Sequence, residues 1–230
     1  MSRTPPPTWK CAITFLVGLA GGERVRRFLF RRLLGYDIHP TAMVGNCFVR
    51  VGQLSLGPSA KIGHFTFIRN ADRVEIGENA RIGTFNWIYG MPGQNDRHFV
   101  GEEARKSSFI MKRESSLTSR HIVDCTNLVE IGAFTTVAGF YTQILTHGID
   151  LDPAKQSSAP VIIGDYCMIG TGCILLKGTI IPDRVVIGAG STVRGQLEDN
   201  TALYSGVPAS RVKYLDPEAE YFHRQTGPVD

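Results

Sequence analysis

Residues 163–192 read IGDYCM IGTGCI LLKGTI IPDRVV IGAGST, five consecutive blocks of six residues. Each block begins with an aliphatic residue, and its fifth residue is small or β-branched. Six aliphatic residues therefore stand at six-residue steps: Ile163, Ile169, Leu175, Ile181, Ile187 and Val193. A helix repeats about every 3.6 residues and a strand every two. The period of six predicts short strands separated by tight turns.

The same pattern recurs upstream, with slips in register between the blocks. Examples are VGNCFV from Val44, LGPSAK from Leu56, IGENAR from Ile76 and IGAFTT from Ile131. Repeats of this kind stack into a solenoid, because one coil cannot bury its apolar edge alone. Three blocks per coil predict a parallel β-helix of triangular section, with the first aliphatic residue pointing inward. Glycine at the second position is expected to free the turn from the steric limits on φ.

Composition fits one folded domain, since 43% of the 230 residues are hydrophobic. We divide the chain into an N-terminal helical segment (1–36), the β-helix (37–215) and a tail (216–230) without an assigned function. The net charge of +4 does not indicate a nucleic-acid partner. Five cysteines without a C-x-x-C pair favour a reducing, cytoplasmic location and no disulfide framework.

The N-terminal segment has an apolar part, Cys11–Gly22, followed by a basic part, Glu23–Leu34. The apolar part is too short for a membrane-spanning helix, which needs about 20 residues. The basic part alternates apolar and arginine positions at helical spacing, which predicts a helix that caps the first coil. The alternative is weak association with a membrane surface, because basic amphipathic helices bind anionic lipid.

Two segments interrupt the repeat, from Tyr89 to roughly Arg120 and from Thr142 to Pro160. Loops on a rigid scaffold commonly carry function. The hexads, the segment IVDCTNLVEIGAFTTVAGFYTQILTHGID from Ile122, and GVPASRVKYL from Gly206 resemble the hexapeptide-repeat acyltransferases, particularly the galactoside, maltose and polysaccharide O-acetyltransferases. The resemblance implies an all-β fold, a left-handed parallel β-helix, with acetyl-CoA as co-substrate. It also implies a homotrimer whose sites lie between chains.

By this resemblance His147 is the general base that takes a proton from an acceptor hydroxyl. His121 precedes the same segment, and we expect that its ring could face the same groove and share in catalysis. Asp124 is a candidate for binding acceptor hydroxyls, although Cys125 stands where relatives have a second acid. Asp150 could contact the substrate region or orient the imidazole. The remaining histidines, His39, His64, His98 and His223, are expected to be inert.

The closing coils of such enzymes bind coenzyme A. The resemblance assigns this role to Thr171, Ala189, Gly190, Arg194, Arg211 and Lys213. Small residues there permit close approach of the pantetheine arm, and cations suit the phosphates.

The leading interpretation is thus an acetyl-CoA-dependent O-acetyltransferase acting on a sugar, a glycan precursor or a glycosylated metabolite. N-acetylation of an amino sugar or sugar nucleotide is the near alternative. Metal catalysis is disfavoured, because three converging histidines are not evident in the sequence, and no metal is expected. A scaffold without catalysis is the third possibility, since fold alone does not fix chemistry.

Overall fold

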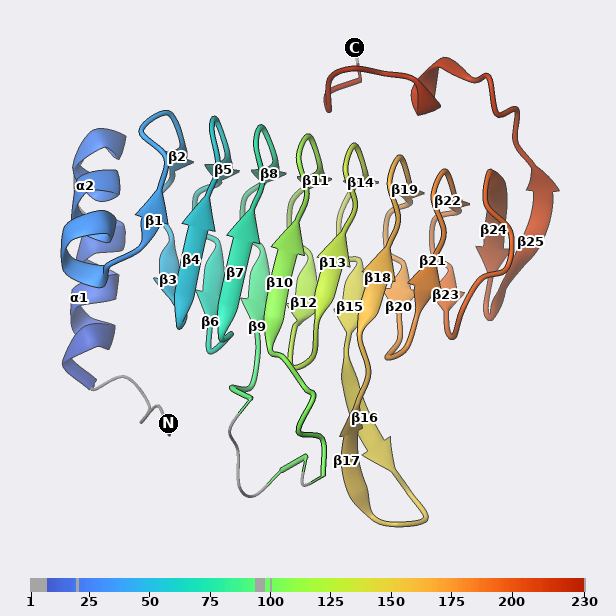
Figure 1. The fold of residues 1–230 in the computed structure, drawn as a ribbon, viewed down its shortest axis with the longest axis horizontal. Coiled ribbons are helices and arrows are strands. Elements are labelled where there is room, and N and C mark those ends of the chain that lie inside the picture. Colours follow the sequence, from blue (N-terminus) through green and yellow to red (C-terminus); the bar gives the residue numbers. More distant parts are fainter. Residues whose placement is uncertain (1–7, 20, 94–97, 100, 230) are drawn as a thin grey trace.

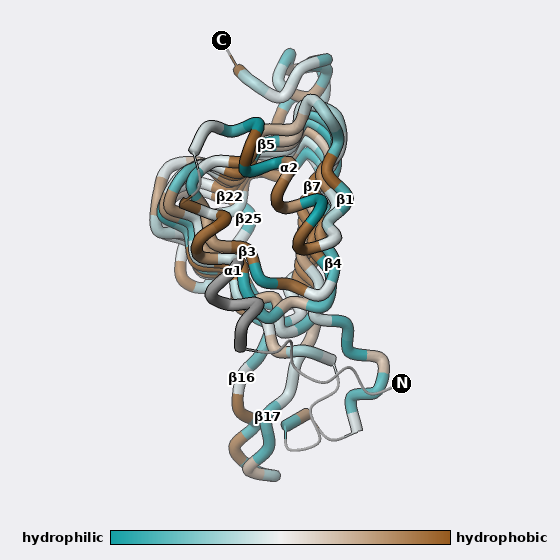
Figure 2. The backbone as a smooth tube through the Cα atoms, turned by 90° about the vertical axis from the view of Figure 1, so that its left-hand side faces the viewer, coloured by the Kyte–Doolittle hydropathy of each residue, from teal (hydrophilic) through white to brown (hydrophobic). Residues whose placement is uncertain are grey.

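The computed structural model describes residues 8–19, 21–93, 98–99 and 101–229. Two helices, α1 (Thr8–Leu19) and α2 (Glu23–Leu34), lie at one end of an elongated prism of stacked coils (Figure 1). Figure 2 looks along the prism axis, with the coils superposed behind the helices. The sequence predicted one helix at this end, and the apolar segment before it supplies most of the second.

Three sheets form the walls of the prism, and their strands are parallel except for the last strand of sheet B, which is antiparallel to its neighbour. This arrangement is typical of the left-handed β-helix that the sequence predicted. Sheet A contains β1 (Asp37–Ile38), β4 (Gln53–Leu56), β7 (Arg73–Ile76), β10 (Ser108–Met111), β13 (Val129–Ile131), β18 (Val161–Ile163) and β21 (Ile180–Ile181). Sheet B contains β2 (Met43–Val44), β5 (Lys61–Ile62), β8 (Arg81–Ile82), β11 (Ser116–Leu117), β14 (Thr136–Val137), β19 (Met168–Ile169), β22 (Val186–Ile187), β24 (Ala202–Gly206) and β25 (Ala209–Tyr214). Sheet C contains β3 (Phe48–Arg50), β6 (Phe67–Arg69), β9 (Trp87–Tyr89), β12 (Ile122–Asp124), β15 (Gln143–Leu145), β20 (Ile174–Leu175) and β23 (Thr192–Val193).

The six-residue period sets the coil and fills its interior. Ile163 of β18 pairs with Ile181 of β21, so an uninterrupted coil has three blocks of six residues. In the five consecutive hexads from Ile163, the leading aliphatic residues are at most 1% exposed, and the small fifth residues are also buried. Burial of each Leu, Ile or Val side chain stabilises the fold by about 1.5–3 kcal/mol. The inward orientation predicted for the first position is confirmed, and the fifth position is buried with it.

The role expected for glycine at the second hexad position is wrong. Gly164 and Gly170 do not have a positive φ; instead, a Cβ added at Gly170 would lie 2.6 Å from the backbone nitrogen of Ala189 in the next coil. The left-handed conformation falls at the fourth position, as in Tyr166 (φ 56°) and Gly172 (φ 68°). Glycine at position two is therefore required by the close stacking of coils.

The first interruption of the repeat is shorter than the sequence predicted. The coil resumes at Ser108, where β10 pairs in register with β7 and β13. Phe109, Met111 and Leu117 occupy the core in this coil and are at most 1% exposed. The segment lacked the usual aliphatic-glycine signature because an aromatic residue and a methionine fill the interior there. The loop therefore ends at residue 107, and the strands of the prism continue from Ser108.

The tail returns along the corner between sheets A and B, away from the inserted loops (Figure 1). The short helix η1 (Glu220–Phe222) buries Phe222, which is 4% exposed. The Arg224 guanidinium lies 3.9 Å from the centre of the Tyr221 ring and donates to the carbonyl of Phe134. Gly227 donates its backbone N–H to the Glu114 carboxylate at 2.8 Å. The tail is thus packed onto the prism.

Candidate functional site

Both insertions leave the prism at the same corner, between sheet C and sheet A. Residues 90–107 connect β9 to β10, and residues 146–160 connect β15 to β18. The second insertion forms an antiparallel hairpin of β16 (His147–Asp150) and β17 (Lys155–Ser158), which projects below the prism in Figure 1. Glu102 of the first insertion accepts a hydrogen bond from the Ser158 backbone N–H at 2.8 Å. The two insertions therefore pack together at one edge.

His147 and Asp124 form a close pair at this edge. Nδ1 of His147 lies 2.5 Å from Oδ2 of Asp124, which ends β12 one coil before the hairpin. The Asp124 carboxylate is fully buried, whereas the His147 side chain is 31% exposed. Backbone N–H groups of Thr126, Thr146 and His147 also donate to this carboxylate, at 2.9–3.1 Å. The carboxylate is therefore fixed by the coil and fixes the imidazole in turn.

The hydrogen bond changes the acidity of both partners. It raises the pKa of His147 above its usual 6.5, although burial and the nearby charges of Arg105 and Lys177 oppose this. Burial raises the pKa of Asp124, but hydrogen bonds from His147 and Thr126 outweigh it, so the net shift is downward. Asp124 is consequently a carboxylate at neutral pH, and it accepts a hydrogen bond from the Nδ1–H group of His147. In this tautomer Nε2 is the basic nitrogen, and it has no hydrogen-bond partner among the described residues.

The first insertion covers one side of the imidazole. The Phe99 ring lies edge-on to His147, with 6.0 Å between ring centres, and the Arg105 guanidinium stacks on Phe99 at 4.5 Å. Arg105 is 6% exposed and donates to the carbonyls of Met91, Pro92 and Thr126 at 2.7–2.8 Å. These bonds fasten the loop to the prism and hold Phe99 against the histidine.

A groove of about 820 Å³ borders the same insertions on the outer side of sheet A. Its lining includes Glu102, Arg105, Asn127 and Ser158. Asn127 connects the groove to the hairpin, because its side chain donates to Ser158 at 2.9 Å. Ser158 pairs directly opposite His147 in the hairpin. The volume is in the range of small-molecule sites, and the walls offer carboxylate, amide and hydroxyl groups for hydrogen bonding.

Residues 160–195, which include all five consecutive hexads, match the family profile described as bacterial transferase hexapeptide (six repeats). Over these residues the chain carries the repeat that is typical of the hexapeptide transferases. Over 73 residues it is 39% identical to a protein of Escherichia coli K12 named as a lipopolysaccharide biosynthesis O-acetyl transferase, WbbJ, covering 32% of this chain and 37% of WbbJ. The chain spans little more than a third of the length of several curated relatives that it matches.

Two further relatives bear on this hexapeptide-repeat protein. An Escherichia coli dTDP-4-amino-4,6-dideoxy-D-glucose acyltransferase is 28% identical over 171 residues, covering 70% of this chain and 82% of that protein. A mutant of AntD, an N-acyltransferase from Bacillus cereus solved with dTDP and coenzyme A, superposes with a TM-score of 0.52. It is 16% identical and covers 86% of this chain and 92% of AntD, so it supports the fold alone.

Two expectations for the acidic residues are corrected. Asp150 does not orient the imidazole, because its carboxylate pairs with Lys177 at 2.7 Å on the outer part of the hairpin. Asp124 takes that place, and its burial and hydrogen bonds leave no free edge for an acceptor hydroxyl. Lys177, which the sequence did not suggest, follows β20 at the same corner one coil beyond β15. The hexad register could have placed Lys177 at this corner, because it gives the position of each residue in its coil.

The expectation that His121 faces the groove is also wrong. Its side chain is 1% exposed, and burial lowers its pKa to about 4. Nδ1 accepts the backbone N–H of Thr142 at 3.1 Å, while Nε2 lies 2.8 Å from the hydroxyl of Thr118. These bonds fit a neutral imidazole that donates from Nε2. His121 is therefore a buried structural residue between coils.

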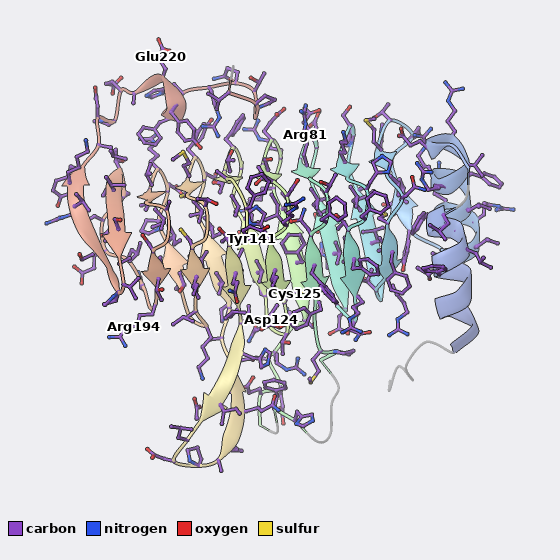
Figure 3. The ribbon with its side chains drawn as sticks, turned by 180° about the vertical axis from the view of Figure 1, so that it is seen from behind. Arg81, Asp124, Cys125, Tyr141, Arg194 and Glu220 are labelled. Carbon is purple, nitrogen blue, oxygen red and sulfur yellow. The ribbon has the colours of Figure 1, made fainter. Side chains whose placement is uncertain are left out.

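The residues proposed for coenzyme A divide between two edges of the prism. Thr171, Ala189 and Gly190 lie at the corner between sheets B and C, where Gly190 donates to the Thr171 carbonyl at 2.9 Å. Arg194 follows β23 at the sheet C to sheet A corner, on the same edge as Asp124 (Figure 3). Arg194 is thus the member of the predicted set that shares a corner with His147 within one chain, two coils further along sheet C.

Arg211 and Lys213 lie on β25, which closes the last coil. Arg211 forms an ion pair with Asp199 at 3.0 Å and stacks on Tyr214. Its charge is thus partly neutralised within the protein. Lys213 is exposed and pairs by backbone register with Leu203. The structure places the two cations at the C-terminal end of the prism.

The described cysteines are unsuited to nucleophilic catalysis. Cys47, Cys125, Cys167 and Cys173 are free and buried, and burial raises the pKa of Cys167 to about 12. A thiol with such a pKa is protonated at neutral pH. Over the described ranges, no group of three or more His, Cys, Asp or Glu residues is arranged to hold a metal ion. No helix in these ranges is long and apolar enough to cross a membrane.

Proposed function

We propose that this protein is an acyl-CoA-dependent O-acetyltransferase that modifies a hydroxyl of a sugar, a glycan precursor or a glycosylated metabolite. The observation that carries the proposal is the 2.5 Å pair of His147 and the buried Asp124 at the mouth of the two insertions. The match of residues 160–195 to the transferase profile supports the reaction class, and the groove beside the hairpin supplies room for an acceptor. Coenzyme A enters as a substrate.

The geometry supports direct transfer with one base. Nε2 of His147 takes the proton of the acceptor hydroxyl while its oxygen forms a bond to the thioester carbonyl carbon. Asp124 accepts a hydrogen bond from the Nδ1–H group and stabilises the imidazolium that results. When the carbon–sulfur bond breaks, His147 returns the proton to the coenzyme A sulfur. Since the described cysteines are buried and protonated, an acyl-cysteine intermediate is not needed in this scheme.

An amine acceptor is the second candidate, and one relative favours it. A curated protein that covers 70% of this chain acts, by its name, on an amino sugar attached to a nucleotide. The same base would then deprotonate an ammonium group or the attacking amine. WbbJ, named as an O-acetyl transferase, is the more identical relative but matches a shorter part of the chain. The acceptor panel below therefore includes both chemical types.

The test is release of free thiol from acetyl-CoA with a panel of sugars, glycosides, nucleotide sugars and amino sugars. Acceptor-dependent release, with a new ester in the product by mass spectrometry, supports O-acetylation. An amide product supports the second candidate. If no acceptor gives release and calorimetry detects no coenzyme A binding, the proposal fails and a scaffold role replaces it.

The pH dependence of kcat/KM is expected to rise with pH, with a midpoint above 6.5. Only the neutral imidazole can accept a proton, and the bond to Asp124 holds the pKa of His147 above its usual 6.5. Activity is therefore low while His147 is protonated and increases as the pH passes its folded-state pKa. Initial rates at low acceptor concentration across the neutral range measure this limb. A midpoint below 6.5, or a flat profile, contradicts the assignment.

We also propose that the protein works as a homotrimer with sites between chains. His147 and the Thr171, Ala189 and Gly190 group lie on different edges of one prism, so contact between two chains would bring them together. The outer face of sheet C offers an apolar surface for this contact, with Phe67, Trp87 and Ile122 all at least 40% exposed. Light scattering is expected to give three times the chain mass, whereas an active monomer would contradict a shared site.

A further inference from the structure

The two helices at the N-terminal end of the prism form a basic and apolar surface, here called the helical cap (Figures 1 and 2). It lies at the opposite end of the molecule from β25 and far from the inserted loops. None of the residues used in the proposed reaction belongs to it. The cap therefore needs an explanation separate from acyl transfer.

The inner side of α2 is firmly attached to the first coil. Phe30 is fully buried and stacks with Tyr36, with 5.9 Å between ring centres. Nε of Arg26 donates to the Val44 carbonyl at 3.0 Å, and Arg27 donates to the Ala42 carbonyl at 2.9 Å. These contacts fix the rotation of the helix about its axis. The remaining side chains are consequently held outward in one orientation.

The outward side combines large apolar groups with positive charge. Leu16 of α1 and Phe28 of α2 are 66% and 60% exposed, and Val25 and Leu33 are each about half exposed. Phe15 and Leu19, although half exposed, line a pocket against the first coils. Arg24, Arg31 and Arg32 are exposed beside them. Within the sequences of the two helices, Glu23 is the sole acidic residue, and it lies 3.9 Å from Arg27. The exposed cap is therefore strongly positive as well as apolar.

This combination identifies one kind of partner. A second copy of the cap would place arginines against arginines in a two-fold contact, which is repulsive. A soluble anion would neutralise the arginines but leave the leucine and phenylalanine side chains in water. An anionic lipid surface satisfies both, because its phosphates attract arginine while apolar side chains enter the acyl boundary. Each helix has 12 residues, which suits lying on a bilayer.

We propose that the helical cap binds the surface of membranes containing anionic phospholipids. The apolar side chains of α1 and α2 insert at the headgroup boundary, and Arg24, Arg31 and Arg32 contact lipid phosphates. The prism then extends from the membrane with its long axis away from the surface. Soluble acyl-CoA would remain accessible at the prism edges, so the binding is independent of the proposed reaction.

The test is co-sedimentation of the full chain with vesicles of phosphatidylcholine alone or mixed with phosphatidylglycerol. Binding is expected for the mixed vesicles and should weaken as salt is added, because the charge interaction is screened. Each arginine near such a surface contributes a factor of about five, so Arg31→Gln with Arg32→Gln should weaken binding about 25-fold. Leu16→Ser with Phe28→Ser should weaken it at least about tenfold.

Matched controls change equally exposed residues elsewhere on the molecule. Lys61→Gln with Arg81→Gln removes two charges from the outer wall of sheet B, and Leu151→Ser with Val207→Ser removes two of the most exposed apolar side chains. Both controls should bind vesicles like the wild type, and circular dichroism checks that all variants fold. The proposal is overturned if the wild type binds both kinds of vesicle equally, or if the control variants weaken binding as much as the cap variants. Growth in particle mass without vesicles, abolished by the Leu16 and Phe28 changes, would also overturn it, because the cap would then bind another copy.

Discussion

Replacing His147 with alanine is expected to lower kcat/KM for a hydroxyl acceptor by about 10²- to 10⁴-fold, the usual contribution of a positioned general base. A hydroxyl is a weak nucleophile until its proton is removed, and Nε2 is the nitrogen placed for that transfer. Coenzyme A binding should be retained, since Thr171 and Gly190, which are proposed to contact coenzyme A, are unchanged in this variant. Thiol release measures the rate, and calorimetry measures coenzyme A binding.

Asp124→Asn is the companion variant. Oδ2 of Asp124 receives hydrogen bonds from the Thr146 and His147 backbone and from the imidazole, at 2.5–3.1 Å. An amide NH₂ at that position would place donors against donors, and an amide oxygen would no longer stabilise the imidazolium. We therefore expect a loss of at least about a hundredfold in kcat/KM, approaching that of the histidine variant.

Asp150→Asn provides the control, because its carboxylate pairs with Lys177 instead of the imidazole. It should retain nearly full activity. The His147 variant should lose less activity with an amine acceptor than with a hydroxyl acceptor, because a free amine is nucleophilic before it loses a proton. Wild-type kcat/KM in the His147 variant with every acceptor would exclude the imidazole as the base.

Gly132→Ala is expected to lower the free energy of unfolding by about 3 kcal/mol, the upper part of the range for overpacking in a rigid interior. Gly132 is the second residue of the hexad IGAFTT, and an added Cβ would lie 2.2 Å from the Gly164 carbonyl oxygen of the next coil. Both atoms belong to stacked backbones, so neither can rotate away. For a chain of this size the loss corresponds to a melting temperature about 6–12 °C lower.

Circular dichroism during thermal unfolding measures this effect. Gly21→Ala is the matched control, because no atom lies within 4 Å of the added Cβ and the residue is exposed between the helices. It should change the melting temperature by no more than about 2 °C. Equal melting temperatures for the Gly132 variant and the wild type would show that the coils can separate locally, contrary to the stacking described above.

The fold was predictable because its repeat is local. The six-residue spacing of Ile163, Ile169 and Leu175 in the sequence corresponds to one strand and one turn of the prism. The prediction failed where the repeat changed its residue types: Phe109 and Met111 fill a coil that the aliphatic pattern could not identify. The reason for glycine at position two was also hidden, because it depends on the distance between coils, which no single hexad contains.

The candidate site was less predictable because its geometry connects residues on different coils. His147 was assigned by resemblance, but its partner Asp124 precedes it by a whole coil and acts from the buried side of the wall. Proximity in sequence pointed instead to Asp150, which the hairpin directs toward Lys177. His121 shows the converse error: a histidine near the site in sequence lies inside the wall in space. Phe99 and Arg105 lie in a segment without periodicity, so their contacts could not be anticipated.

The placement of both insertions at one corner affects how this protein can change over evolutionary time. Residues 146–160 are inserted between β15 and β18, yet β13 and β18 still pair in uninterrupted parallel register. The pairing of β13 with β18 therefore does not depend on the length of the inserted loop. A lineage can therefore lengthen, shorten or exchange the parts of these loops beyond His147 without disturbing the coil that holds Asp124. Substitutions and length changes in these loops can then alter the acceptor, while His147 and Asp124 stay the same.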